Sequence, residues 1–182
     1  MQNESFPALT GFYRLLFFYI EPISTTVPVF MIWFFPGATW FYNELVPEIK
    51  SVSNLHLPAK MAIWQLANCY FLLGLIGSLV FRAARDSLRN DLVAQERIVG
   101  ALLMALAIAD ISHVAVSVLA TPYEIIMKPS SWNGAFIGNV PFTLFLFCCR
   151  FWETNVLLFS QEAPQSSVTK VDRHGLIITS VE

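Results

Sequence analysis

Four long apolar stretches dominate the chain, and each has the length of a helix that crosses a bilayer. Such a helix needs roughly 20 mostly apolar residues. The stretches cover residues 12–35, 61–81, 98–120 and 135–159, and helix-breaking or charged residues bound each of them. A transmembrane β-barrel would instead show segments of about 10 residues with alternating polarity. The pattern therefore predicts an all-α, polytopic membrane protein folded as a four-helix transmembrane bundle.

This pattern divides the chain into an N-terminal segment (residues 1–11), a four-helix domain (12–160) and a polar tail (161–182). Four spans place both termini on the side of the loop 82–97, where basic residues gather if that side is cytoplasmic. This side holds Arg14, Arg82, Arg85, Arg89, Arg97, Lys170 and Arg173, and the other side holds Lys50, Lys60 and Lys128. We therefore expect cytoplasmic termini. The first stretch is too long and too interrupted for a cleaved signal peptide.

Composition strengthens this interpretation and excludes several classes of protein. Of 182 residues, 55% are hydrophobic and 13% are charged, about half the usual charged share of a soluble domain. A soluble globular enzyme is thereby excluded, and a net charge of −2 argues against nucleic acid as a partner. No Cys/His spacing typical of zinc and no glycine-rich phosphate loop is present in the sequence. We expect no metal and no cofactor.

Polar side chains occur at membrane depth in every predicted span. Such groups are costly in lipid and usually face the interior of a bundle. They are Glu21 in the first span, Gln65 and Asn68 in the second, Asp110 and His113 in the third, and Asn139, Thr143, Arg150 and Glu153 in the fourth. Spacings of three, four and seven place those of each span on one helix face. The sequence therefore predicts a polar interior surrounded by an apolar shell.

Depth in the membrane indicates how these groups pair. Glu21 and Arg150 both lie roughly 15 Å from the same end of their helices. We therefore expect them to form a structural ion pair, with Glu153 as a second carboxylate for the same arginine. No cation is evident for Asp110 except His113 on its own helix. Three carboxylates outnumber the arginine, so either His113 is protonated or one carboxyl keeps its proton. An Asp–His dyad at mid-membrane is a functional hypothesis by default.

The candidate catalytic residues are thus Asp110, His113 and Glu21, and the candidate substrate-binding residues are Asn68, Gln65 and Asn139. The structural alternative is that these groups only hydrogen-bond between helices and specify their pairing.

Several segments resemble a family of small fungal membrane proteins that is labelled only as a domain of unknown function. The segments are residues 13–24, 65–68, 109–113, 132–133 and 138–140, together with Arg150. The resemblance implies a four-helix membrane unit, often associated with natural-product pathways, and it supplies no catalytic residues. The charged connection from Arg82 to Arg97 is longer than in that family. A looser fold-level similarity extends to the membrane family of sterol isomerases and the sigma-2 receptor.

Three functions stay open at this point. The first is a cofactor-free cyclase or isomerase that uses acid–base chemistry on a lipophilic isoprenoid or sterol-like substrate in a fungal secondary-metabolite pathway. The second is a non-catalytic lipid-binding or scaffolding protein, and the third is a subunit of a proton-coupled transporter. The expected partners are the lipid bilayer, a lipophilic small molecule and either a second copy or pathway enzymes. The expected location is the endoplasmic reticulum.

Overall fold

A computed structural model describes residues 6, 8–9, 11–162, 170–171 and 177–178, and it confirms the four-helix membrane fold. Four helices are long and apolar enough to cross a membrane: Gly11–Trp33, Leu57–Ser87, Leu92–Ala120 and Gly134–Leu157. The elements are α1 (Gly11–Leu15), η1 (Leu16–Ile20), α2 (Glu21–Trp33), α3 (Ala38–Glu44), α4 (Leu57–Ser87), α5 (Leu92–Ala120), α6 (Tyr123–Ile126), η2 (Pro129–Ser131), α7 (Gly134–Ile137), η3 (Gly138–Phe142), α8 (Thr143–Glu162), β1 (Lys170–Val171) and β2 (Ile177–Ile178). Of these, η1 and η3 are π-helical, and β1 pairs antiparallel with β2. Of the expected tail, residues 161–182, the structure describes only 161–162 and the two short strands.

The second and third helices are longer than the apolar pattern predicts. Helix α4 has 31 residues and α5 has 29, which corresponds to roughly 45 Å each, against a hydrocarbon core of about 30 Å. The predicted loop 82–97 is therefore wrong, because only residues 88–91 interrupt the two helices. Charged residues end an apolar span without ending a helix, since a helix that protrudes into water keeps its backbone hydrogen bonds. Asp91 begins α5 by accepting a hydrogen bond from the Ala94 N–H at 2.9 Å.

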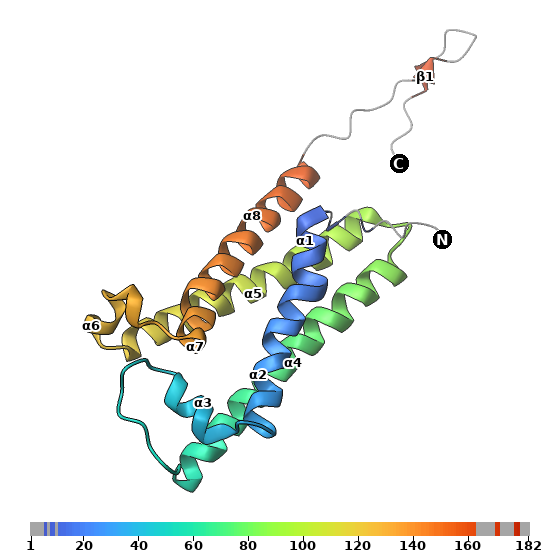
Figure 1. Cartoon of the computed structure of the whole chain (residues 1–182). Coiled ribbons are helices and arrows are strands. Elements are labelled where there is room, and N and C mark those ends of the chain that lie inside the picture. The colour runs from blue at the N-terminus through green and yellow to red at the C-terminus, as the bar shows by residue number, and fades with distance from the viewer. Residues whose placement is uncertain (1–5, 7, 10, 163–169, 172–176, 179–182) are drawn as a thin grey trace.

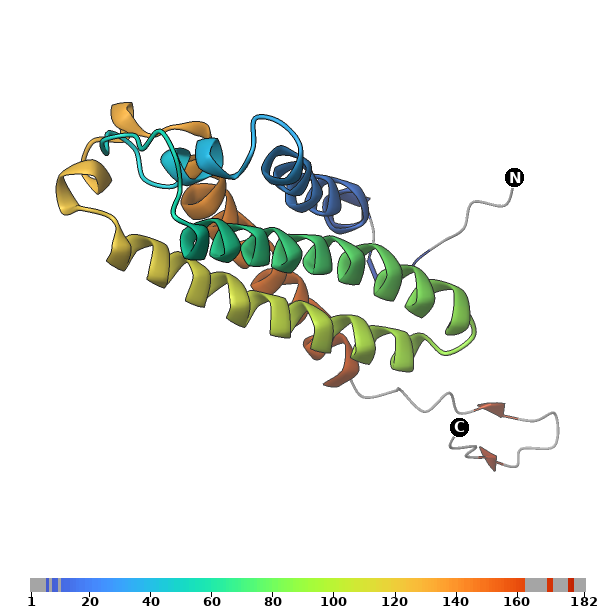
Figure 2. The same ribbon diagram turned by 90° about the horizontal axis from the view of Figure 1, so that it is seen from below.

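The helices are arranged as two pairs, with α2 packed on α4 and α5 packed on α8 (Figures 1 and 2). Glycines of α4 permit the close approach in the first pair. A Cβ at Gly74 would lie 2.7 Å from Thr26 Oγ1, whereas a Cβ at Gly77 would lie 3.6 Å from Pro22 Cγ. Small residues at a helix interface allow this kind of backbone approach in membranes.

An apolar core joins the two pairs at the end of the bundle where α4 turns into α5, which we call the terminal end (Figure 1). Phe6 and Leu9 of the N-terminal segment are 2% and 0% exposed, and they pack into this core. The Phe6 ring meets Phe18 edge to face at 5.3 Å. The buried Gln95 amide accepts from the Ala8 N–H at 3.4 Å and donates to the Ala84 carbonyl at 3.5 Å. Phe6, Ala8 and Leu9 therefore close the terminal end.

At the opposite end, which we call the loop end, contacts between the connecting segments join the two pairs. The Asn133 side-chain amide, at the start of α7, donates to the Glu44 carbonyl at 2.9 Å and to its carboxylate at 3.0 Å. Lys128 forms an ion pair with Glu48 at 3.0 Å. Helix α3 also packs on α2 and α4, where Phe41 is buried in a second apolar core. Both ends are thus tied, and the middle of the bundle lies between them.

Candidate functional site

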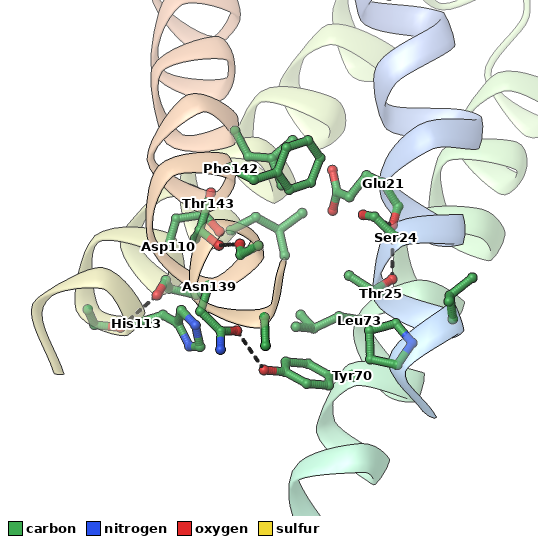
Figure 3. Close-up of a pocket in the computed structure, with 18 of the residues that line it drawn as sticks. Glu21, Ser24, Thr25, Tyr70, Leu73, Asp110, His113, Asn139, Phe142 and Thr143 are labelled. Carbon is green, nitrogen blue, oxygen red and sulfur yellow. Dashed lines mark hydrogen bonds between the residues drawn. The ribbon is translucent and has the colours of Figure 1, made fainter. Parts of the chain in front are cut away.

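A cavity of about 790 Å³ lies between the two helix pairs, within the size range of small-molecule sites. Its walls come from α2, α3, α4, α5, α7, η3 and α8, and they are mostly apolar. Figure 3 shows Glu21 and Leu73 on one side and Phe142 and His113 on the other. Val27 and Val116 also line the cavity, and they are 49% and 66% exposed. The cavity therefore reaches the surface of the bundle beside these two valines.

A buried charged triad of Glu21, Asp110 and Arg150 forms part of the cavity wall. Arg150 Nη2 lies 2.5 Å from Glu21 Oε1, and the two side chains are 3% and 4% exposed. Arg150 Nη1 donates to Asp110 Oδ2, and its guanidinium lies over the Phe17 ring at 5.9 Å. The Glu21–Arg150 ion pair expected from helix depth is confirmed. The expectation that no cation serves Asp110 is wrong, because Arg150 reaches both carboxylates.

The second oxygen of Glu21 has a different environment. Among the described residues, Glu21 Oε2 is buried and has no hydrogen-bond partner. Two carboxylates and one guanidinium would leave the triad with a charge of −1. A net buried charge is unfavourable, so one bound proton on a carboxyl neutralises the group. Glu21 Oε2 has no partner among the described residues, so it is an oxygen of the triad that can carry such a proton.

Two π-helical turns position the polar residues on opposite walls. In the first, the Glu21 N–H donates to the Leu16 carbonyl five residues earlier, and the following Pro22 has no N–H to continue an α-helical pattern. In the second, which contains Pro141, the Thr143 hydroxyl donates to the Gly138 carbonyl at 3.0 Å. Isolated π turns of this kind occur frequently at functional sites. Here they flank Glu21 and enclose Asn139.

A second polar group, which we call the outer polar cluster, consists of Tyr70, His113 and Asn139. The Tyr70 hydroxyl donates to Asn139 Oδ1 at 3.2 Å, and the His113 ring lies beside the Asn139 amide (Figure 3). The predicted Asp110–His113 dyad is wrong, because Asp110 turns to Arg150 while His113 turns to Asn139. The sequence analysis did not include Tyr70. It could have been found as a hydroxyl group within an apolar span, because a buried tyrosine hydroxyl usually has a hydrogen-bond partner.

Two predicted substrate-binding residues lie away from the cavity. Gln65 and Asn68 are exposed on α4, whose buried face instead carries Ile63, Ala67 and Gly74. The sequence showed that Gln65 and Asn68 share a face, but it did not show toward which neighbour that face turns. Of the three predicted substrate-binding residues, only Asn139 lines the cavity.

Glu153 is buried at 7% exposure, but it is not part of the triad. Within the described residues no ion pair joins Glu153 to Arg150, so this part of the expected pairing is wrong. Glu153 instead interacts electrostatically with Tyr13 of α1. In the part of the chain that the structure describes, no group of three His, Cys, Asp or Glu side chains lies where it could hold a metal ion.

Fold and site together define a polytopic membrane protein with a charged triad in the wall of a cavity between two helix pairs. The chain belongs to the family described as a domain of unknown function (DUF7704), whose sequence profile matches residues 6–159. That range contains all four spans, the charged triad and the outer polar cluster. No curated protein and no solved structure matches the chain.

Proposed function

We propose that this protein is a cofactor-free membrane enzyme that isomerises or cyclises a lipophilic substrate by proton transfer, with Glu21 as the acid. One observation carries this proposal: Glu21, which belongs to a triad with one more carboxylate than cations, lines an apolar cavity and has a buried oxygen without a hydrogen-bond partner among the described residues. A carboxylic acid kept neutral in an apolar site is a proton donor. The substrate class is an isoprenoid or sterol-like molecule, which the apolar walls favour.

The reaction can be written with the charges balanced. The acid at Glu21 Oε2 gives its proton to a substrate double bond, which forms a C–H bond and leaves a carbocation. Arg150 already contacts the other oxygen of Glu21, so it stabilises the carboxylate that this step creates. Loss of a proton from a neighbouring carbon, either directly or after ring closure, returns the proton to Glu21. The cavity stays net neutral throughout, because the cation and the new carboxylate form together.

The other cavity residues have supporting roles in this proposal. Asp110 holds Arg150 in place and balances its charge, so in this proposal it supports the acid and is not itself the catalytic residue that the sequence suggested. The ring of Phe142 borders the same cavity opposite Glu21 (Figure 3), and the face of an aromatic ring stabilises a nearby cation.

Deuterium transfer from solvent tests the proposal without a known substrate. Membranes containing the protein are incubated in D₂O with a pool of isoprenoid and sterol metabolites, and the extracts are compared by mass spectrometry. We expect a product that carries solvent deuterium with the wild type, and loss of that product with Glu21→Gln. The matched control is Glu153→Gln, which changes a buried carboxyl outside the cavity and should keep the product. Equal labelling by folded Glu21→Gln would refute the proposal.

A non-catalytic lipid-binding or scaffolding protein is the second candidate. It is favoured by the pairing of Asp110 with Arg150, since a triad that links α2, α5 and α8 also specifies how the helices assemble. If the protein is not catalytic, no product acquires deuterium with either the wild type or Glu21→Gln. A place in the endoplasmic reticulum, cytoplasmic termini and a role in natural-product biosynthesis remain part of the proposal, supported by the distribution of basic residues and the family resemblance.

A further inference from the structure

The serine and threonine hydroxyls of the cavity already donate hydrogen bonds within their own helices. The Ser24 and Thr25 hydroxyls donate to the Glu21 carbonyl at 2.8 and 3.0 Å. Ser112 donates to the Ala109 carbonyl at 2.8 Å, and Thr143 donates within its own helix in the same way. These hydroxyls make the wall less apolar without offering a donor to a ligand. Recognition therefore depends on Glu21 and on the outer polar cluster.

The two polar sites lie at different levels of the cavity. Figure 3 shows Glu21 at one end of the lining residues and Tyr70, His113 and Asn139 at the other. Along α5, Asp110 of the triad and His113 of the cluster are three residues apart, a rise of roughly 5 Å. Leu73, Leu106 and Phe142 belong to the apolar wall of the same cavity. A molecule that contacts both sites therefore needs an apolar body between its two ends.

The outer polar cluster is built for an oxygen atom. Its three side chains come from α4, α5 and η3, so they converge from both helix pairs. The Tyr70 hydroxyl occupies Asn139 Oδ1, which directs the Asn139 amide N–H groups elsewhere. An amide N–H donates to a hydroxyl or carbonyl oxygen, and an imidazole nitrogen can accept from a hydroxyl. Tyr70 is a positioning residue in this arrangement, because it acts through Asn139.

We infer that the cavity takes a lipophilic alcohol or ketone whose oxygen binds to Asn139 and His113, with Tyr70 orienting the amide, while its hydrocarbon end reaches Glu21. This inference rests on the proposed ligand-binding role of the cavity and adds the polarity and the direction of the substrate. It places the reacting double bond at the end of the molecule remote from its oxygen. A ligand with no oxygen would displace water from the outer polar cluster without replacing the hydrogen bonds to that water, which is unfavourable.

Competition binding with a matched pair of probes tests this inference. Radiolabelled farnesol, an isoprenoid alcohol, is bound to the purified full chain in detergent, and it is displaced by unlabelled farnesol or by farnesene, the hydrocarbon with the same skeleton. The ratio of the two inhibitory concentrations measures the preference for the hydroxyl. Comparing this ratio between variants cancels the different partitioning of the probes into micelles.

The wild type should prefer farnesol, and Asn139→Leu should reduce that preference about five-fold, the effect of one hydrogen bond between neutral groups. Tyr70→Phe should reduce the preference by a smaller factor. Because this variant removes only one hydroxyl, it serves as the test if Asn139→Leu fails to fold. Asn68→Leu is the matched control, because Asn68 is exposed on α4 outside the cavity, and its preference should equal that of the wild type.

Several outcomes would overturn the inference. They are no binding of either probe, equal binding of both by the wild type, or an unchanged preference in both Asn139→Leu and Tyr70→Phe. Loss of the preference in Glu21→Gln, with Asn139→Leu unaffected, would show the opposite direction of binding. The deuterium assay is independent of these ratios, so failure of the proposed chemistry and failure of this recognition site can be told apart.

Discussion

Replacing Arg150 by methionine removes the one cation of the charged triad while keeping a long side chain in its place. The Arg150 side chain is 3% exposed, and its two ion-pair partners, Glu21 and Asp110, are 4% and 13% exposed. The variant leaves both carboxyls in a buried site without their cation. Three helices meet at this point, so the loss acts on contacts of α8 with both α2 and α5.

The size of the effect follows from this burial. Removing one partner of a buried ion pair costs about 3–5 kcal/mol in soluble proteins, and single interhelical hydrogen bonds in membranes average about 0.6 kcal/mol. Two charge-assisted contacts are lost here, so we expect the free energy of unfolding to fall by about 3 kcal/mol. Lys128→Met is the control, because its ion pair with Glu48 is exposed at 57% and 50%. Exposed pairs contribute about 0–1 kcal/mol.

The free energy of unfolding can be measured by steric trapping in bicelles for the wild type and both variants. The triple variant Glu21→Gln, Asp110→Asn, Arg150→Met should recover most of the loss, because no uncompensated charge is then buried. If Arg150→Met unfolds with a free energy within about 1 kcal/mol of the wild type, the triad does not hold the helices together. Equal instability of the triple and single variants would show that packing at this position matters more than charge.

Three further changes probe the packing of the bundle, and each is measured by thermal unfolding of purified protein. Gly74→Ala should destabilise the protein by about 1–3 kcal/mol, because its Cβ would meet Thr26 Oγ1 at 2.7 Å, whereas Gly77→Ala should be close to neutral. Equal effects of the two would contradict the close approach of α2 and α4. Gln95→Leu should cost about 1–3 kcal/mol, since it strands the buried Ala8 N–H that its amide accepts from; an unchanged transition would argue against that contact. Phe6→Ala should cost about 3–5 kcal/mol by opening the core at the terminal end, and a wild-type transition would show that the N-terminal segment does not close it.

The family to which the chain belongs has no assigned function, so the cavity offers a direct place to begin. Our two proposals assign different roles to its two polar sites. Glu21 is the proposed acid at one end, and Asn139 with His113 is the proposed recognition site for an oxygen at the other. Experiments that separate turnover from binding therefore address the two sites one at a time.

Some of the site could be predicted from helix depth alone. Glu21 and Arg150 lie at similar distances along their helices, and opposite charges at one depth in a membrane have few other partners. Asp110 shows the limit of this reasoning, because its partner depended on how far the Arg150 guanidinium reaches across the bundle. Phe6 shows another limit, since a short apolar segment outside the spans gives no sign that it folds back into the core.

The sequence by itself determined that four helices cross the membrane and that charged groups lie within them, because hydrophobic length and the cost of a charge in lipid are local properties. It did not determine which helices pair or which polar face turns inward. Gln65 and Asn68 share a face of α4 that turns outward, while Tyr70 two residues further on turns into the cavity. That choice belongs to the tertiary structure, because the contact of Gly74 with α2 sets the rotation of α4. The cavity, and with it any binding site, forms only when the two helix pairs contact each other at both ends and stay apart in the middle.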